Sequence, residues 1–210
     1  MCAMEDVLEL YAEPYDPERP VVCFDEKSLQ LLAQTRPPLS VGPREPARHD
    51  YEYKRQGTAN LFVSVEPLPG RRQVHVTAQR TRLDFAKEMK QLVDVDYPEA
   101  RCIRVVLDNL NTHGPASLYE AFAPEEASRL RHRLEFHHTP RHASWLNMAE
   151  IEISALSRQC LKRRIPDAEA LATQIAAWQT ERNQAQVKIH WHFTVADARS
   201  KLSRLYPDTP

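Results

Sequence analysis

Three acidic residues occupy positions where their carboxylates could hold a metal ion. Asp25 directly follows the apolar run Val21–Phe24, and Asp108 directly follows the run Ile103–Leu107. The third acid, Glu150, lies in the first turns of a stretch with helical periodicity. A charge beside an apolar run is costly to bury unless it is paired or bound to a metal. Clustered carboxylates repel one another, and a hard divalent cation, Mg²⁺ or Mn²⁺, relieves that repulsion through all-oxygen ligation.

Two such ions held about 3.5–4 Å apart can activate a nucleophile and stabilise the leaving oxygen of an in-line phosphoryl displacement. Asp25, Asp108 and Glu150 therefore predict a divalent-metal site, with two ions expected, that acts on a phosphodiester. A structural alternative stays open at this point. Acids also end strands and begin helices because of turn chemistry and the helix dipole.

The elements that must position these acids follow from hydrophobic periodicity. Apolar or alternating runs predict strands at 21–24, 58–65, 73–77, 103–107 and 134–138. Apolar residues at helical spacing predict helices from the N-cap Thr81 to Val93, at 116–133 with a break near Pro124, at about 145–164, from Asp167 to about 185, and at 195–205. Residues 1–19 are expected to form a short helix and a linker, and the proline-rich stretch 36–50 an extended surface excursion.

This order of elements predicts an α/β fold with a mixed five-stranded sheet flanked by helices, the order used by ribonuclease H-like folds. A right-handed crossover places the strand at 103–107 beside the strand at 21–24. Because adjacent strands lie about 4.8 Å apart, Asp25 and Asp108 are expected to be neighbours.

Three short motifs carry a resemblance to a known family. The sequence reads DE at 25–26, DNLNTH at 108–113 and SWLNMAE at 144–150. Together these motifs resemble those of the mariner superfamily of DDE transposases, most closely its bacterial insertion-sequence branch. The resemblance extends over about 21–207, which is most of the chain.

The resemblance implies an enzyme domain that cuts and joins DNA strands in transposition, with the three acids as metal ligands. Water would attack a phosphodiester at the transposon end, and the freed 3′-hydroxyl would then attack target DNA. It also implies that Asn109 and His113 orient the ligands or contact phosphate. Asn147 would cap the helix that carries Glu150 and hold that acid towards the site.

The same resemblance gives expectations about organisation and partners. A ribonuclease H-like catalytic domain is expected over 21–207, after a linker or short helix at 1–20, and the helix-turn-helix DNA-binding region of relatives is expected to be absent. The expected partners are transposon-end and target DNA and a second copy of the chain, in the cytoplasm of a bacterium and at its nucleoid when bound to DNA. Two alternatives stay open: a non-catalytic transposase remnant that binds DNA or a full-length transposase, and a general ribonuclease H-like nuclease.

Composition excludes several other classes of protein. The 210 residues include 4 glycines and contain no glycine-rich phosphate loop, which disfavours Rossmann and P-loop chemistry. The 4 cysteines are far apart and form no CxxC pair, so neither a cysteine-based zinc site nor a disulfide framework is expected. No apolar run reaches the roughly 18 residues that a membrane-spanning helix needs.

The net charge of −1 conceals an asymmetry along the chain. Residues 1–100 carry 13 basic and 17 acidic side chains, whereas residues 101–210 carry 15 and 12. Arg158, Lys162 and Arg163 form a basic stretch at the end of the predicted 145–164 helix. They are expected either to contact DNA phosphates or to compensate the helix dipole from a solvated surface.

Overall fold

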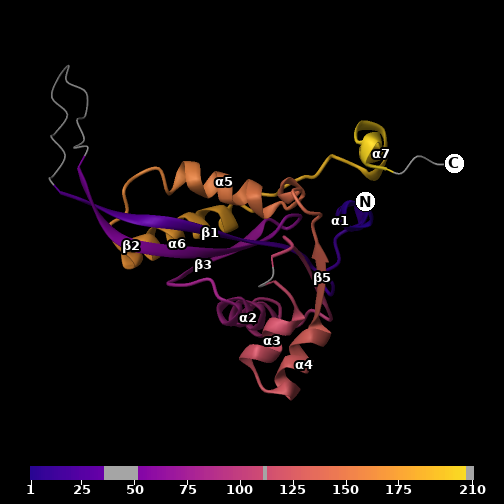
Figure 1. Ribbon diagram of the computed structural model, residues 1–210, viewed down its shortest axis with the longest axis horizontal. Helices are drawn as coiled ribbons and strands as arrows, with labels where there is room; N and C mark the ends of the chain where they lie inside the picture. The colour runs from indigo at the N-terminus through magenta and orange to yellow at the C-terminus, as the bar shows by residue number, and fades with distance from the viewer. Residues whose placement is uncertain (36–51, 111–112, 207–210) are drawn as a thin grey trace.

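The computed structural model describes residues 1–35, 52–110 and 113–206, and its centre is a five-stranded sheet (Figure 1). The proline-rich stretch 36–50, for which an extended excursion was expected, and the motif residues Asn111 and Thr112 lie outside the described residues. The strands are β1 (Val21–Gln34), β2 (Tyr53–Glu66), β3 (Arg71–Thr77), β4 (Ile103–Leu107) and β5 (Leu134–His138).

The strand order is β3-β2-β1-β4-β5, with β1–β4 and β4–β5 parallel and the other two pairs antiparallel. The expected mixed sheet of the ribonuclease H-like type is confirmed, including the placement of the fourth strand beside the first. The helices are α1 (Cys2–Ala12), α2 (Arg82–Gln91), α3 (Pro115–Ala121), α4 (Pro124–Arg133), α5 (Ala149–Gln159), α6 (Ala168–Gln184) and α7 (Val195–Lys201). Short turns of other helix types cover Leu92–Asp96, Ser144–Leu146 and Ser203–Leu205.

Helices cover both faces of the sheet, with α2, α3 and α4 on one side and α5 and α6 on the other (Figure 1). Strand alternation assigns residues to the two faces. Val22 and Phe24 pack in the core under α2, whereas Cys23 packs in the core that also contains α1 and the start of α5. Helix α1 contributes Val7 and Leu8 to that second core. No helix within the described ranges is long and apolar enough to cross a membrane.

The first strand is longer than its apolar run predicts. Pairing with β4 stops at Cys23–Val106, but antiparallel pairing with β2 continues as far as Gln34. Asp25 was expected directly after its strand. It lies instead inside β1, at a position beyond the last residue pair that β1 forms with β4. The extension is held by backbone hydrogen bonds to β2 and by Leu31, which packs in the core formed with α5 and α6.

The helix expected at 145–164 is shorter at both ends. A single 3₁₀ turn covers Ser144–Leu146, Asn147 is extended, and α5 begins at Ala149. At the other end the helix stops at Gln159, and the Leu32 N–H donates to the carbonyl oxygen of Ile165 at 2.8 Å. The segment after α5 thus runs beside β1 instead of continuing as a helix.

A buried charged cluster joins the sheet to α5 and α6. The Arg72 guanidinium, with a fully buried side chain, lies 2.9 Å from Glu152 Oε1, and Arg182 Nε donates to the same oxygen at 2.8 Å. Arg72 also donates to the carbonyl oxygens of Gly70 and Val187 at 2.8 and 2.5 Å. No sequence pattern marked this cluster, because an arginine in a strand more often lies at the surface.

Candidate active site

Asp25 and Asp108 lie side by side at the point where β1 and β4 separate. Each is two residues beyond the last paired position, Cys23–Val106. The pKa of Asp25 is raised to about 7, chiefly by burial and also by the carboxylates of Glu150, Asp108 and Glu26, against a backbone hydrogen bond from Glu26 that lowers it. The fold therefore brings the three acids expected from the sequence within electrostatic reach of one another.

His113 connects Asp108 to a fourth acid. Its Nδ1 lies 2.6 Å from Asp108 Oδ1 and its Nε2 lies 2.7 Å from Glu26 Oε1. The imidazole is fully buried and stacks on Phe85 with ring centroids 4.9 Å apart. Burial opposes protonation of the ring, but the two carboxylate partners prevail and raise the pKa of His113 to about 9. Position 113 is therefore an imidazolium at neutral pH, held between two carboxylates.

Asn147 ties the start of α5 to β1. Its side chain is fully buried, with Nδ2 donating to the Phe24 carbonyl oxygen at 2.8 Å and Oδ1 accepting from the Ala149 N–H at 3.1 Å. The N-cap position itself belongs to Met148. Asn147 therefore acts one residue earlier than expected, and it anchors the helix that carries Glu150 to the residue before Asp25.

Replacing Asn147 with alanine is expected to lower the free energy of unfolding by about 1–3 kcal/mol, because the Phe24 carbonyl loses a buried partner. The start of α5 would also lose its tether to β1, so binding of divalent metal should weaken. Urea unfolding and metal titration of the same preparation measure both effects. A variant with unchanged stability would contradict this role of the side chain.

Glu150 and Glu152 lie two residues apart on α5 and have different surroundings. Successive helical residues are separated by about 100°, so the two side chains lie on nearly opposite sides of the helix. Glu152 is fully buried in the cluster with Arg72, whereas Glu150 is exposed. Within the described residues the Glu150 carboxylate makes no hydrogen bond. It is therefore free to bind a cation together with the two aspartates.

The donor set suits a hard divalent cation. All three predicted ligands supply carboxylate oxygens, the preferred ligands of Mg²⁺ and Mn²⁺. The raised pKa of Asp25 reflects, beside burial, the repulsion that such a cation would relieve. Within the described residues no group of three His, Cys, Asp or Glu side chains is close enough to hold one ion between them. The carboxylate oxygens thus fit a divalent cation in their chemistry. Their side chains are not close enough together in this structure to bind a single ion.

The remaining predicted site residues lie outside this cluster or at its edge. Asn109 is exposed beside Asp108. Arg158 lies in the last turn of α5, about 12 Å along the helix from Glu150. Lys162 and Arg163 are exposed after α5 and line a groove of about 380 Å³ beside β1. Arg158 thus lies away from Glu150 along α5, and Lys162 and Arg163 lie in the groove that follows the helix.

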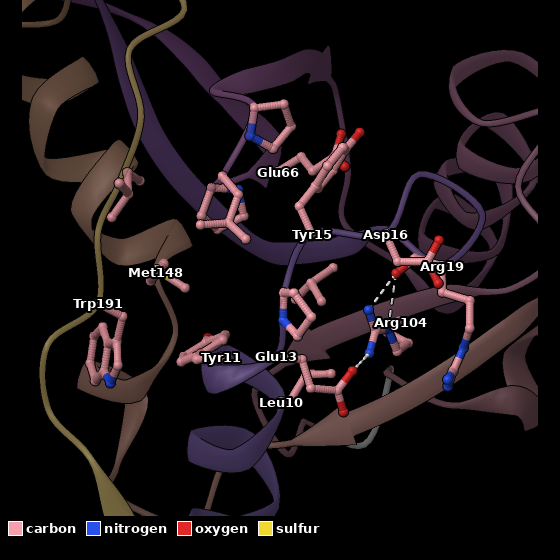
Figure 2. A pocket seen from close by; sticks show the side chains of 16 residues that line it. Leu10, Tyr11, Glu13, Tyr15, Asp16, Arg19, Glu66, Arg104, Met148 and Trp191 are labelled. Carbon is pink, nitrogen blue, oxygen red and sulfur yellow. Dashed lines mark hydrogen bonds and ion pairs between the residues drawn. The ribbon is translucent and has the colours of Figure 1, made fainter.

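A separate small hollow of about 40 Å³ lies at the opposite end of β1 and β4 (Figure 2). Val21 and Arg104 line it from these strands, and Tyr11 and Trp191 line it from α1 and the C-terminal segment. Arg104 forms an ion pair with Glu13 there and donates to the Arg19 carbonyl oxygen. Among the described residues that line the hollow, none belongs to the acid cluster.

The sheet is thus of the ribonuclease H-like type, with Asp25 and Asp108 beside the divergence of β1 and β4 and Glu150 at the start of α5. The chain belongs to the DDE superfamily endonuclease family, whose sequence pattern matches residues 20–172. No curated protein sequence matches it.

Solved structures of Mos1 mariner transposase share the fold. The Mos1 paired-end complex with Mn has a TM-score of 0.58 and 16% identity, and the match covers 89% of this chain and 56% of that chain. The complex with the left transposon end has a TM-score of 0.60 and 16% identity, with the same coverage. The strand transfer complex has a TM-score of 0.59 and 14% identity, covering 89% and 55%. The chain thus spans a little over half the length of these transposase chains.

Proposed function

We propose that this chain is the catalytic domain of a DDE transposase of the mariner superfamily, from its bacterial insertion-sequence branch, that cuts and joins DNA strands. The observation that carries the proposal is the position of Asp25 and Asp108 where β1 and β4 separate, with Glu150 at the start of α5 within electrostatic reach of Asp25. Family membership and the shared fold support it. The motifs at 25–26, 108–113 and 144–150 are the reason for choosing this branch.

In this proposal the three carboxylates hold two ions of Mg²⁺ or Mn²⁺. When bound, the ions activate the attacking oxygen and stabilise the leaving oxygen of the phosphodiester. Related Mos1 structures are described as containing Mn or Mg, which supports the choice of metal. His113 holds one oxygen of Asp108, and Asn147 fixes the start of the helix that presents Glu150.

DNA is the proposed partner, and two copies of the chain are proposed to act on paired ends. Mos1 transposase has been solved as paired-end complexes, one of them with the left transposon end, and this likeness supports the assignment. The proposed phosphate contacts are Asn109 beside the acids and Arg158, Lys162 and Arg163 farther along α5 and the following groove. The catalytic domain is proposed to extend over 21–207.

The test uses the full chain with Mg²⁺ or Mn²⁺ and three DNA substrates. These are duplexes from the regions that flank its gene, an unrelated duplex, and a branched junction. Nicking and strand joining confined to the flanking duplexes are the expected result. Cleavage of the junction with indifference to sequence would instead indicate a general nuclease, and binding without cleavage in either metal a non-catalytic remnant.

Reversing the charge of the groove is expected to weaken DNA binding. In the double variant Lys162→Glu/Arg163→Glu, the apparent affinity at low salt should fall at least about tenfold, and the dependence on salt should become shallower because fewer counterions are released. Fluorescence anisotropy over a series of salt concentrations measures both quantities. Lys188→Glu/Lys201→Glu, a matched reversal outside the groove, should bind as the wild type. Equal affinity of the groove variant and the wild type would show that Lys162 and Arg163 do not contact DNA.

A further inference from the structure

The side chain of Glu26 lies on the opposite face of the sheet from the side chain of Asp25. Neighbouring residues of a strand point to opposite faces. Asp25 shares its face with Cys23, towards α5, whereas Glu26 shares its face with Phe24, towards α2. Its carboxylate is only 3% exposed. Glu26 is thus a buried acid next to Asp25 in the chain, and its side chain points away from the Asp25 carboxylate.

Glu26 therefore fixes one carboxylate oxygen of Asp25 directly and one of Asp108 through His113. The backbone N–H of Glu26 donates to Asp25 Oδ1 at 2.7 Å, and its side chain binds His113, which in turn binds Asp108 Oδ1 at 2.6 Å. Within the described residues, the Oδ2 atoms of Asp25 and Asp108 make no hydrogen bond. The arrangement leaves one oxygen of each aspartate available to a cation.

The imidazole of His113 has little freedom to turn between its partners. It stacks on Phe85 from α2 and meets Phe24 edge-on, with ring centroids 6.1 Å apart. Rotation of the ring would break both carboxylate contacts inside a buried site, where charged groups need their partners. Removing Glu26 would therefore release His113, and through it Asp108.

We propose that Glu26 is a positioning residue for the metal site, acting through His113 on Asp108. The inference rests on the proposed function, because it takes Asp108 to be a ligand. Groups that orient metal ligands typically change metal affinity by about 10–100-fold when they are replaced. Glu26 points away from the site, so its effect should depend on the presence of His113.

The experiment is a double-mutant cycle on Mn²⁺ affinity, measured by calorimetry on the full chain. Glu26→Gln and His113→Gln are each expected to weaken binding by about tenfold, and the double variant also by about tenfold. Glu88→Gln is the matched control, because Glu88 pairs with His75 at 2.5 Å in a similar contact outside the site. It should bind Mn²⁺ as the wild type.

Three outcomes overturn the inference. Wild-type affinity in Glu26→Gln would show that the residue does not position Asp108. A double variant weakened about a hundredfold would indicate direct charge effects, since the two losses would then add. Equal weakening in Glu88→Gln would indicate a general loss of structure. If Glu26→Gln does not fold, Glu26→Asp takes its place in the cycle with the same expectation.

Asp25→Asn separates this inference from the proposed function. Loss of Mn²⁺ binding in Asp25→Asn, with wild-type affinity in Glu26→Gln, would leave the proposed function in place and reject only the role of Glu26. Absence of Mn²⁺ binding in the wild type would overturn both.

Discussion

Replacing Asp108 with asparagine is expected to lower metal-dependent DNA cleavage by about a thousandfold or more. The reason is that metal ions contribute several kcal/mol to charge stabilisation, and each 1.36 kcal/mol is worth about tenfold in rate. Asparagine keeps the shape of the side chain and one oxygen for His113, but it removes the negative charge that a divalent cation requires. Nicking of end-containing DNA, followed by gel electrophoresis, measures the effect.

The fold of this variant should be retained. The Asp108 side chain is 29% exposed, and its ion pair with His113 is replaced by a neutral hydrogen bond, so the loss in stability should be about 1 kcal/mol or less. Asp197→Asn serves as the matched control, because Asp197 caps α7 far along the chain from the acids. Cleavage by Asp108→Asn at the rate of this control would reject Asp108 as a ligand.

Replacing Glu152 with alanine is expected to lower the free energy of unfolding by about 3–5 kcal/mol, because Arg72 would remain buried without its partner. The side chains of Arg72 and Glu152 are 0% and 1% exposed, so water cannot compensate the remaining charge. Domains of this size have stabilities of about 5–15 kcal/mol, and the change should lower the melting temperature by roughly 6–20 °C. Urea and thermal unfolding measure it.

Glu150→Gln is the control for this experiment, two residues away on the same helix. Its side chain is exposed, so the change in stability should stay within about 0.5 kcal/mol. The two variants are expected to differ in the property they lose: Glu150→Gln should be stable but inactive, whereas Glu152→Ala should be destabilised. A stable Glu152→Ala variant would show that the buried cluster does not hold α5 on the sheet.

Much of the sheet could be predicted from sequence because its strands carry apolar or alternating runs. Ile103–Leu107 and Leu134–His138 were expected with the bounds that the structure has. The end of β1 was not predicted, because the polar residues 25–28 separate Leu29, Leu31 and Leu32 from the apolar run at the start of the strand. Its antiparallel pairing with β2, which joins residues distant in the sequence, is what makes these residues one strand.

The candidate site shows the same limit. Asp25, Asp108 and Glu150 could be located because each follows a recognisable element or motif. The role of Glu26 could not be read from its position, since contact with His113 joins residues 87 positions apart through the fold. The one available signal was its place in the pair DE at 25–26, which does not reveal a partner.

Iron-dependent cleavage of the peptide backbone can locate the metal site on the chain itself. Fe²⁺ is loaded in place of Mg²⁺, and ascorbate with peroxide generates radicals that cut the peptide backbone near the ion. Cuts are expected near residues 25, 108 and 150, suppressed by excess Mg²⁺ and lost in Asp25→Asn. Cuts confined to other parts of the chain, or a pattern unchanged by Asp25→Asn, would contradict a metal centre formed by these three acids.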